Sequence, residues 1–344
     1  MEEQLDHEKI NPNSDQHPEV VMITGASAGV GRAVVREFAR RKASIGLIAR
    51  GRERLEAAKT EVEEKGGRAL VFPLDISDPE AVEQAAERLE NEFGPLKIWI
   101  NNAMTTIFAP FTEIKPDEFK RATEVTYLGC VYGTRAALRR MRPRDSGTVV
   151  QVGSALAYRS IPLQAPYCGA KHAIVGFTDS LRCELIHNNS DIHLTVVHLP
   201  AINTPQFSWC RTRLPRHPQP VPPIFEPELA AEAIYWAAHH KRREVFVGGP
   251  TAKAIYGQDI GPGFADWYLG KTGYAAQQTS EPVSPDRPDN LFDPVQGNYA
   301  AHGIFGSAAK RFSLQNWLNL HRAPVTLIGA GLVGAAALIW RQNV

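Results

Sequence analysis

The sequence predicts a doubly wound α/β fold, in which helices cover both faces of a seven-stranded parallel β-sheet. Short runs rich in β-branched residues alternate with longer helical stretches from Val20 to about Gly249, which is the order that a parallel sheet with helical crossovers requires. A glycine-rich segment separates the first run from the first helical stretch. Seven such runs follow one another, so a single domain accounts for all of them.

The expected strands are short, and the segments between them have helical patterning. They are Val20–Thr24, Ser44–Ala49, Arg68–Leu74, Ile98–Asn101, Thr148–Val152, Ile192–Leu199 and Glu244–Gly248. Helix starts are indicated at Asp78-Pro79 and at Lys115-Pro116, because proline fits the first turn of a helix. The proline-rich stretch Pro200–Pro227 interrupts this alternation directly after a strand, at the edge where open α/β sheets bind ligands.

The composition is that of an ordinary globular protein, with 43% apolar and 22% charged residues over 344 positions. Its 38 basic and 37 acidic residues leave a formal charge of +1, so no overall field attracts nucleic acid, and we set that partner aside. The four cysteines show no Cys-x-x-Cys spacing, which argues against a zinc site or a disulfide framework. We therefore expect a cytoplasmic protein without a metal site.

The chain divides into four expected parts. Residues 1–18 are polar, without the basic start and apolar run of a secretory signal, and are expected to be a disordered tail. Residues 19–250 form the α/β domain. Residues 251–322, rich in glycine, proline and aromatic residues, are expected to be an irregular extension, and residues 323–344 an apolar helix.

The glycine-rich segment Thr24–Gly31 joins the first expected strand to a helical stretch. In this context glycines provide a tight turn, a close backbone approach and room for helix packing, while the helix amino end presents free N–H groups to a pyrophosphate. The segment predicts a Rossmann-type dinucleotide site, and the alternative is an ordinary loop between a strand and a helix. The residues assigned to this part of the site are Gly25, Ser27, Ala28, Gly29, Val30 and Gly31.

Charged residues follow the second and third expected strands. Arg50 stands where an acidic residue commonly binds the adenosine ribose, and a guanidinium there suits a 2′-phosphate. We therefore favour NADP over NAD; in the alternative, Arg50 only extends along the protein surface toward water. Asp75, which precedes Ile76, is expected either to accept a hydrogen bond from the adenine amine or to serve as a turn residue. Both Asp75 and Ile76 are assigned to the cofactor site.

Tyr167 and Lys171 stand four residues apart in a helical stretch, thirteen residues after Ser154. Residues four apart share a helix face, so an ammonium there can favour the ionised form of a phenol. A phenol that exchanges its proton near neutral pH is a general acid or base for a carbonyl or an alcohol. In the alternative, Ser154 is a strand-end hydroxyl and Tyr167 an ordinary residue of an amphipathic helix.

Taken in this order, the motifs resemble the short-chain dehydrogenase/reductases, in particular the single-domain branch with Thr-Gly-x-x-x-Gly-x-Gly and Tyr-x-x-x-Lys. The resemblance extends from Val20 to about Gly249. Further matching segments are Asn101-Asn102-Ala103-Met104 and Pro200-Ala201-Ile202-Asn203-Thr204. The resemblance implies a homo-oligomeric dehydrogenase or reductase acting on CH–OH groups, and Arg50 adds the preference for NADP.

The resemblance also implies roles for individual residues. Tyr167 is expected to donate the proton in carbonyl reduction or to accept it in alcohol oxidation, and Ser154 to hydrogen-bond the reacting oxygen. Lys171 is expected to hold the nicotinamide ribose and to lower the pKa of Tyr167. The remaining cofactor contacts are assigned to Asn101, Asn102 and Ala103 beneath the cofactor, and to Pro200, Ile202 and Thr204 around the nicotinamide amide and the phosphate.

Three positions depart from the family pattern. Met104 replaces a glycine, and Cys168 replaces a common serine. Thr126 stands where the family has an asparagine that fixes a water for proton relay to the lysine. A threonine hydroxyl is shorter and lacks the second function of the amide, so we include Thr126 in the catalytic set and expect a weakened or rerouted relay. On this interpretation Thr126→Asn raises turnover.

Val325–Trp340 is a run of sixteen residues without a charge. As a helix it spans about 24 Å, less than the roughly 30 Å hydrocarbon core of a bilayer. Flanking arginines and Trp340 partly relieve this mismatch, so the sequence favours attachment of a cytoplasmic domain to a membrane through this tail. The alternative is a helix buried against its own domain or in a dimer.

The primary functional interpretation is an NADPH-dependent carbonyl reductase, or the reverse alcohol dehydrogenase. Its expected pocket wall is mostly apolar, which favours a lipophilic alcohol or ketone as substrate. This wall consists of Ile107, Phe108, Tyr158, Ile161 and a lid formed by Pro200–Pro227. The alternatives are an NADPH-binding scaffold or redox sensor with weak turnover, and a structural membrane protein with a vestigial site.

Overall fold

The computed structural model describes residues 18–284, 286–297 and 299–321. Residues 1–17 of the expected N-terminal tail and the apolar segment 323–344 lie outside these ranges, and so does the predicted terminal helix. Within the described ranges, no helix has both the length and the apolar character needed to cross a membrane.

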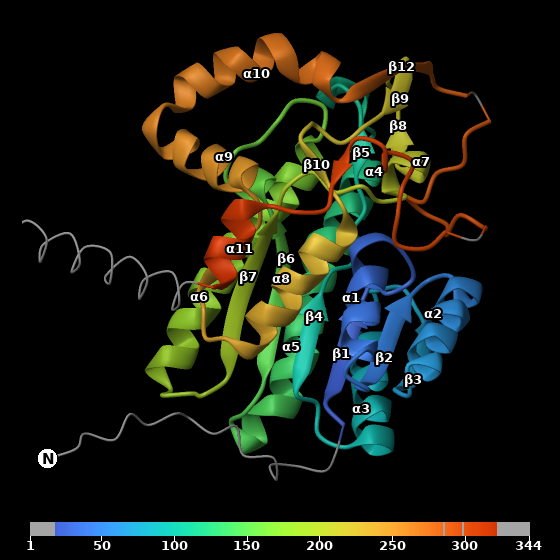
Figure 1. Ribbon diagram of the computed structural model, residues 1–344, viewed down its shortest axis with the longest axis vertical. Helices are drawn as coiled ribbons and strands as arrows, with labels where there is room; N and C mark the ends of the chain where they lie inside the picture. The colour runs from blue at the N-terminus through green and yellow to red at the C-terminus, as the bar shows by residue number, and fades with distance from the viewer. Residues whose placement is uncertain (1–17, 285, 298, 322–344) are drawn as a thin grey trace, which may run out of the picture.

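A seven-stranded parallel sheet in the order β11-β7-β6-β4-β1-β2-β3 forms the centre of the molecule (Figure 1). Its strands are β1 (Val20–Thr24), β2 (Ser44–Ala49), β3 (Arg68–Pro73), β4 (Ile98–Asn101), β6 (Thr148–Ser154), β7 (His193–Leu199) and β11 (Glu244–Phe246). The doubly wound α/β prediction is confirmed. The strand order reverses between β1 and β4, and ligands bind at such a switch point in open α/β sheets.

Helices cover both faces of the sheet. One face is covered by α1 (Gly29–Ala39), α2 (Arg52–Glu64) and α8 (Pro227–His239). The other is covered by α3 (Pro79–Phe93), α5 (Gly129–Met141) and α6 (Ala165–His187). The segment before α5 contains α4 (Pro116–Thr123) and a π-helical turn, η2 (Glu124–Leu128). Single 3-10 turns are η1 (Phe111–Glu113), η3 (Arg142–Arg144) and η4 (Ala155–Ala157).

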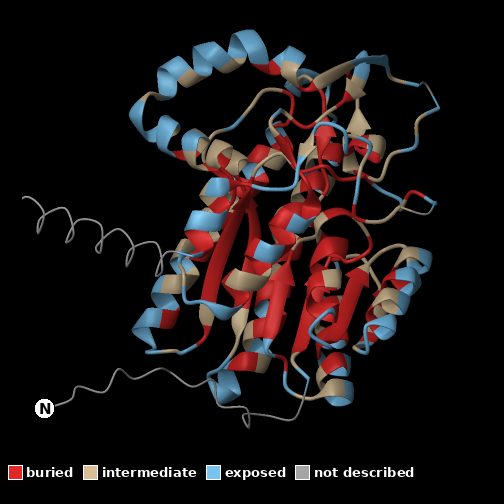
Figure 2. Ribbon diagram, viewed as in Figure 1, coloured by how far each residue is buried: buried red, intermediate tan, exposed pale blue. Residues whose placement is uncertain are grey.

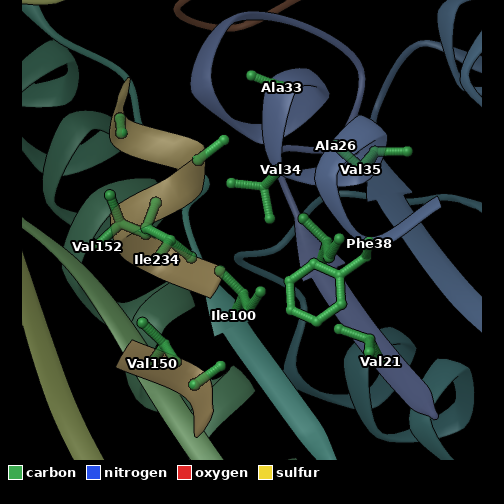
Figure 3. Close-up of a cluster of buried hydrophobic side chains, with 14 of the residues drawn as sticks. Val21, Ala26, Ala33, Val34, Val35, Phe38, Ile100, Val150, Val152 and Ile234 are labelled. Atoms are coloured by element: carbon green, nitrogen blue, oxygen red, sulfur yellow. The ribbon is translucent and has the colours of Figure 1, made fainter. Parts of the chain in front are cut away.

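The strands are buried on both faces, as Figure 2 shows for the centre of the sheet. In β1 the side chains alternate, because successive residues of a strand point to opposite faces. Val21 and Ile23 join the cluster under α1 and α8, whereas Val20 and Met22 join the cluster under α3 and α5. In Figure 3, Phe38 of α1 lies above β1, among the side chains of the first cluster. This two-sided burial explains why the strands appear in the sequence as continuous apolar runs.

The segment between β7 and α8 contains short elements of its own. They are α7 (Gln206–Trp209), β8 (Arg211–Thr212), β9 (Arg216–Pro218) and β10 (Ile224–Phe225). β8 pairs in parallel with β5 (Ile107–Phe108), which fixes this segment beside the carboxyl end of the sheet.

The C-terminal extension contains more regular structure than its composition suggests. Its elements are α9 (Gly249–Ile260), α10 (Pro262–Ala276), β12 (Gln278–Pro282), β13 (Ala309–Lys310) and α11 (Leu314–Leu320). Pro250 and Pro262 lie in the first turns of α9 and α10, where proline is tolerated, so they begin helices instead of breaking them. β12 pairs with β9 and β13 pairs with β10, which attaches the extension to the segment before α8.

Candidate active site

A cavity of about 630 Å³ opens at the carboxyl end of the sheet. It lies among the ends of the parallel strands, the segment before α8, and helices α9 and α10. All the predicted site residues line it except Gly31, Asn101 and Thr126. The residues converge because the carboxyl ends of parallel strands meet at one edge of the sheet.

The glycine turn is built so that larger residues do not fit. Gly25 has a φ of 68°, in the left-handed region, and a Cβ there would lie 2.8 Å from the Asn102 side chain. A Cβ on Gly31 would lie 2.1 Å from the Gly25 carbonyl oxygen. Gly31 therefore does not line the cavity but lets α1 start directly against the turn. The Thr24 hydroxyl accepts hydrogen bonds from the Asn102 and Ala103 N–H groups at 2.9 and 3.0 Å, which joins the turn to the end of β4.

The amino end of α1 fits an anionic ligand. Its cap is Ala28, which gives no side-chain hydrogen bond, and the first turn contains no acidic residue. A helix start without a side-chain cap leaves N–H groups and the positive end of the helix dipole for a phosphate. The N–H of Gly29 donates to the Ala300 carbonyl oxygen at 3.0 Å, so the C-terminal extension also reaches this turn.

Two arginines after β2, Arg50 and Arg54, are held without a direct ion pair among the described residues, although Asp75 and Asp293 lie near enough to stabilise the charge of Arg50 and Glu53 that of Arg54. Arg50 and Arg54 line the cavity, and burial lowers the pKa of both guanidiniums. Their hydrogen bonds go to backbone carbonyls of the extension, from Arg50 to Phe292 at 2.6 Å and from Arg54 to Val295 at 2.7 Å. Neither forms an ion pair with a carboxylate of the described chain. Carbonyl dipoles satisfy the N–H groups but leave two positive charges beside the cavity.

Asp75 is a turn residue, one of the two roles expected for it. Its carboxylate accepts hydrogen bonds from the Ser77 N–H at 2.9 Å and from the Ser77 hydroxyl at 2.8 Å. It also forms an ion pair with Arg121. Burial acts to raise the pKa of Asp75, but the bonds from Arg121 and Ser77 outweigh it and leave this pKa below its ordinary value. Asp75 and Ile76 both line the cavity, and the contact with adenine stays a prediction.

Ser154, Tyr167 and Lys171 meet at the cavity wall. Ser154 ends β6, while Tyr167 and Lys171 lie one turn apart on α6. The Ser154 hydroxyl hydrogen-bonds the Tyr167 side chain, and it also caps η4 by accepting from the Leu156 N–H at 3.1 Å. The Lys171 ammonium lies 5.6 Å from the centre of the Tyr167 ring and donates to the Val152 carbonyl oxygen at 2.5 Å.

The electrostatics of this cluster differ from the expectation. Burial raises the pKa of Tyr167 above its ordinary value, and only the hydrogen bond from Ser154 opposes this. Burial also lowers the pKa of Lys171 to about 8, so its charge is less firmly held than that of an exposed lysine. The expected lowering of the Tyr167 pKa by Lys171 is not found: desolvation raises this pKa, and the opposing contribution comes from Ser154.

Thr126 and Asn101 lie beneath the cavity. The Thr126 hydroxyl, in the π-helical turn η2, donates to the Thr105 carbonyl oxygen at 3.0 Å and accepts from the Thr105 N–H at 3.1 Å. Asn101 donates to Thr134 and Gln151 in a buried polar network. Of the three residues assigned to the cofactor floor, Asn102 and Ala103 line the cavity, whereas Asn101 does not because its side chain is held in this network.

The expected substrate wall is only partly correct. Of its four named side chains, Ile161 lines the cavity. Ile107 and Phe108 are buried in separate apolar clusters, and the Tyr158 hydroxyl donates to Glu244 at 2.8 Å, away from the cavity. The expected segment Pro200–Pro227 does line the cavity, through residues that include Phe207, Val221 and Pro223. Met104, Leu156, Leu269 and Ala276 also belong to the wall.

A buried amide pair at this wall could not be read from the sequence. Gln164, which precedes α6, donates to the side chain of Gln277 at 2.7 Å. Gln277 in turn donates to the carbonyl oxygens of Pro162 at 2.9 Å and Gly273 at 2.8 Å. The pair fastens the end of α10 to the start of the helix that carries Tyr167. Its members are 113 residues apart, and no local pattern signals such a contact.

A parallel sheet with a glycine turn, an uncapped helix start and a strand-end cavity defines a nucleotide-binding α/β protein. A family model described as short chain dehydrogenase matches residues 19–213. The chain is 31% identical to the uncharacterized oxidoreductase YxnA of Bacillus subtilis (strain 168), over 80% of this chain and 78% of that protein. It is 32% identical to the 3-dehydrosphinganine reductase of Danio rerio, over 55% of this chain and 58% of that protein.

A solved structure agrees on the fold. It is a short-chain dehydrogenase from Streptomyces avermitilis, with a TM-score of 0.62 and 22% identity, covering 77% of this chain and all of the other. The chain belongs to the short-chain dehydrogenase family. This family consists of oxidoreductases that use NAD or NADP, and the residues that surround the cavity fit such a cofactor: the glycine cradle, the uncapped helix start and the two arginines.

Proposed function

We propose that the chain is an NADP(H)-dependent oxidoreductase that interconverts a carbonyl and a secondary alcohol on a small lipophilic molecule. The observation that carries this proposal is the cluster of Ser154, Tyr167 and Lys171 on the wall of the cavity that the glycine turn also lines. A serine hydroxyl that is hydrogen-bonded to a phenol, with an ammonium one helical turn away, is an arrangement that can transfer a proton to a carbonyl oxygen.

When bound, the nicotinamide cofactor supplies or accepts the hydride. The residues of the chain position and transfer the proton. Ser154 orients the reacting oxygen toward Tyr167, and Tyr167 gives its hydroxyl proton to that oxygen in the reductive direction. Because burial disfavours the phenolate, Tyr167 holds its proton strongly until an acceptor is in place. The hydrogen bond from Ser154 stabilises the phenolate left behind, and Lys171 binds the cofactor ribose.

The preference for NADP is supported by Arg50 and Arg54. Both guanidiniums are partly desolvated, line the cavity and have no ion-pair partner within the described residues. The 2′-phosphate of NADP is an anionic partner for these two guanidiniums, whereas the ribose 2′-hydroxyl of NAD carries no charge.

The lipophilic substrate class is supported by the wall of the cavity. Aliphatic, proline and aromatic side chains dominate its substrate end, and the Gln164–Gln277 pair already satisfies its own hydrogen bonds there. Some relatives carry names that refer to lipids. One is the 3-dehydrosphinganine reductase of Danio rerio, and another is the 17-beta-hydroxysteroid dehydrogenase 13 of Homo sapiens, which is 34% identical over 48% of this chain.

A second candidate is an NADPH-binding scaffold with weak turnover. The observation that favours it is Thr126, whose hydroxyl donates to the Thr105 carbonyl oxygen and accepts from the Thr105 N–H. Thr126 then has no free donor for the proton relay that the family asparagine serves, although the cofactor site is retained.

The assay that separates these candidates follows NADPH oxidation with a panel of hydrophobic ketones. Wild type is expected to turn over, and Tyr167→Phe to lose at least about a hundredfold in rate because it has no proton to give. Tyr158→Phe is the matched control and is expected to keep its rate, since Tyr158 lies outside the cavity. An NADPH-induced rise in melting temperature without turnover on any ketone would favour the scaffold.

Two other expectations stay proposals. The family resemblance supports a homo-oligomer, which sedimentation of the purified chain tests. The uncharged run Val325–Trp340 supports attachment to a membrane. Recovery of the full chain in the soluble fraction after lysis without detergent would count against that attachment.

A further inference from the structure

Most residues of helix α10 are exposed to water. Gly273 is the one buried residue of this fifteen-residue helix. Large apolar side chains on α9 and α10 face water instead, with exposed fractions of 87% for Ile260, 69% for Phe264 and 60% for Trp267. Tyr256, Tyr268 and Tyr274 are exposed as well. Figure 2 shows most of α10 as exposed ribbon at the top of the molecule. We call these six side chains the α9–α10 aromatic face.

An exposed face of this composition is typical of a surface that binds a partner. Most helices in proteins are stabilised by packing of an apolar side, and a helix that turns its aromatic side to water forgoes that contribution. Three side chains of the face lie together, since the Phe264 ring centre lies 5.9 Å from that of Trp267 and 6.2 Å from that of Tyr268. A contiguous exposed apolar patch on a single chain marks a binding surface.

Charge is sparse on these two helices. They carry Lys253, Asp259, Asp266 and Lys271, and Asp266 is held by an ion pair with Arg159. The remaining side-chain charges are two lysines and one aspartate. Lysine stems can lie along a lipid surface while their ammonium groups stay among the headgroups.

The composition and the position of the face point to lipid as its partner. Tryptophan and tyrosine favour the membrane interface, where their rings are apolar and their polar groups meet water. α10 also lines the cavity, through Tyr268 of the face and through Leu269, Thr272 and Ala276, so the face lies directly beside the cavity. In addition, α11 contacts α9, and the uncharged run Val325–Trp340 follows five residues after α11 ends.

We propose that the α9–α10 aromatic face docks on the surface of a lipid bilayer, with α10 lying at the headgroup boundary beside the entrance of the cavity. Interfacial helices bury an apolar side to a shallow depth without crossing the bilayer. A lipophilic molecule dissolved in the bilayer then reaches the cavity along α10. The docking itself does not depend on the proposed activity.

The test uses the full chain with the Cys183→Ser substitution, because Cys183 is the exposed cysteine and the other three are buried. An environment-sensitive fluorophore is attached at Phe264→Cys. The matched control carries it at Phe111→Cys, since Phe111 is 68% exposed against 69% for Phe264 but belongs to η1. Each protein is mixed with phosphatidylcholine and phosphatidylglycerol vesicles whose acyl chains carry a spin-label quencher.

Docking predicts a blue shift and at least about twofold stronger quenching for the probe at position 264 than for the probe at position 111. Three results would overturn it. If the vesicles carry the protein down on centrifugation but quench neither probe, another segment makes the contact. Equal quenching of both probes means adsorption without orientation. A concentration-dependent blue shift at position 264 without vesicles identifies a second copy of the chain as the partner. NADPH oxidation by the labelled proteins reports separately on the proposed function.

Discussion

At the scale of single residues, unpaired charge is the most informative feature of the cofactor site. Arg50 donates to backbone carbonyls of residues 290–292, which fix its position without cancelling its charge. A guanidinium held in this way is ready for an anion and does not need to reorganise when the anion binds.

Arg50→Ala is expected to weaken NADPH binding by about tenfold to a hundredfold, because a charge-assisted hydrogen bond contributes about 1.5–3 kcal/mol. Binding of NADH should change little. Titration of cofactor fluorescence measures both constants. Arg52→Ala is the control, since its side chain is 69% exposed and pairs with Glu56 at 3.4 Å. Equal losses for NADPH and NADH would show that Arg50 supports the strand end and not the phosphate.

Thr126 has a structural role that the family comparison did not suggest. Its hydroxyl satisfies both the N–H and the carbonyl of Thr105, and the residue is 1% exposed. Thr126→Val keeps the shape but leaves two backbone groups unsatisfied, so unfolding free energy should fall by about 1–3 kcal/mol. Urea denaturation measures this, and Thr126→Ser is expected to retain most of the stability. If Thr126→Val were as stable as wild type, the backbone contact would be dispensable.

At the scale of elements, Glu118 joins α4 to the segment before α8. It is 2% exposed and accepts from Arg211 at 2.8 Å and from Arg213 at 2.7 Å. The Lys115 N–H also donates to it at 2.9 Å. Burial acts to raise the pKa of Glu118, but these bonds lower it to about 2 from an ordinary value of 4.5. The Glu118 side chain is therefore charged, and as a carboxylate it holds β8 against the domain.

Glu118→Gln is expected to lower the free energy of unfolding by about 3 kcal/mol at neutral pH, because it removes one partner of a buried charge cluster. Since the folded-state pKa is depressed, the stability from Glu118 is present above pH 4.5 and is lost as the pH falls toward 2. Melting curves between pH 7 and pH 3 should thus converge for wild type and variant. The exposed Glu113→Gln serves as control, and a pH-independent difference would contradict the ionic explanation.

At the scale of the whole molecule, the C-terminal extension returns to the cofactor groove. Arg287 donates to the carbonyl oxygens of Phe207 at 2.5 Å and Cys210 at 2.6 Å, which ties the extension to α7. Further along, Ala300 accepts from the N–H of Gly29. The extension therefore connects the segment beside the substrate end with the glycine turn.

Arg287→Ala is expected to weaken NADPH binding by about tenfold, because it loosens the backbone that positions Arg50 and Arg54. The measurement is the NADPH-induced rise in melting temperature, compared with Arg311→Ala, an exposed arginine of the same extension. An unchanged rise in Arg287→Ala would mean that the extension does not organise the cofactor site.

Much of the fold and the placement of Tyr167 beside Lys171 could be predicted, because their signals are local. β-branched runs mark buried strands, and a spacing of four places Tyr167 and Lys171 on one helix face. The direction in which a single side chain points is harder to predict from the sequence. Asn101 and Asn102 are neighbours at the end of β4, yet opposite directions send one into a buried network and the other to the cavity.

By itself the sequence determined the doubly wound sheet, the glycine turn and the shared helix face of Tyr167 and Lys171, since each follows from steric or periodic rules acting within a few residues. The place of Ser154 beside them was expected from the family resemblance. Tertiary structure alone decided the part of the cavity wall that comes from α10, the hydrogen bonds of Thr126 and the carbonyls that hold Arg50. Those carbonyls come from residues about 240 positions away, and no local pattern encodes a contact that only chain packing creates.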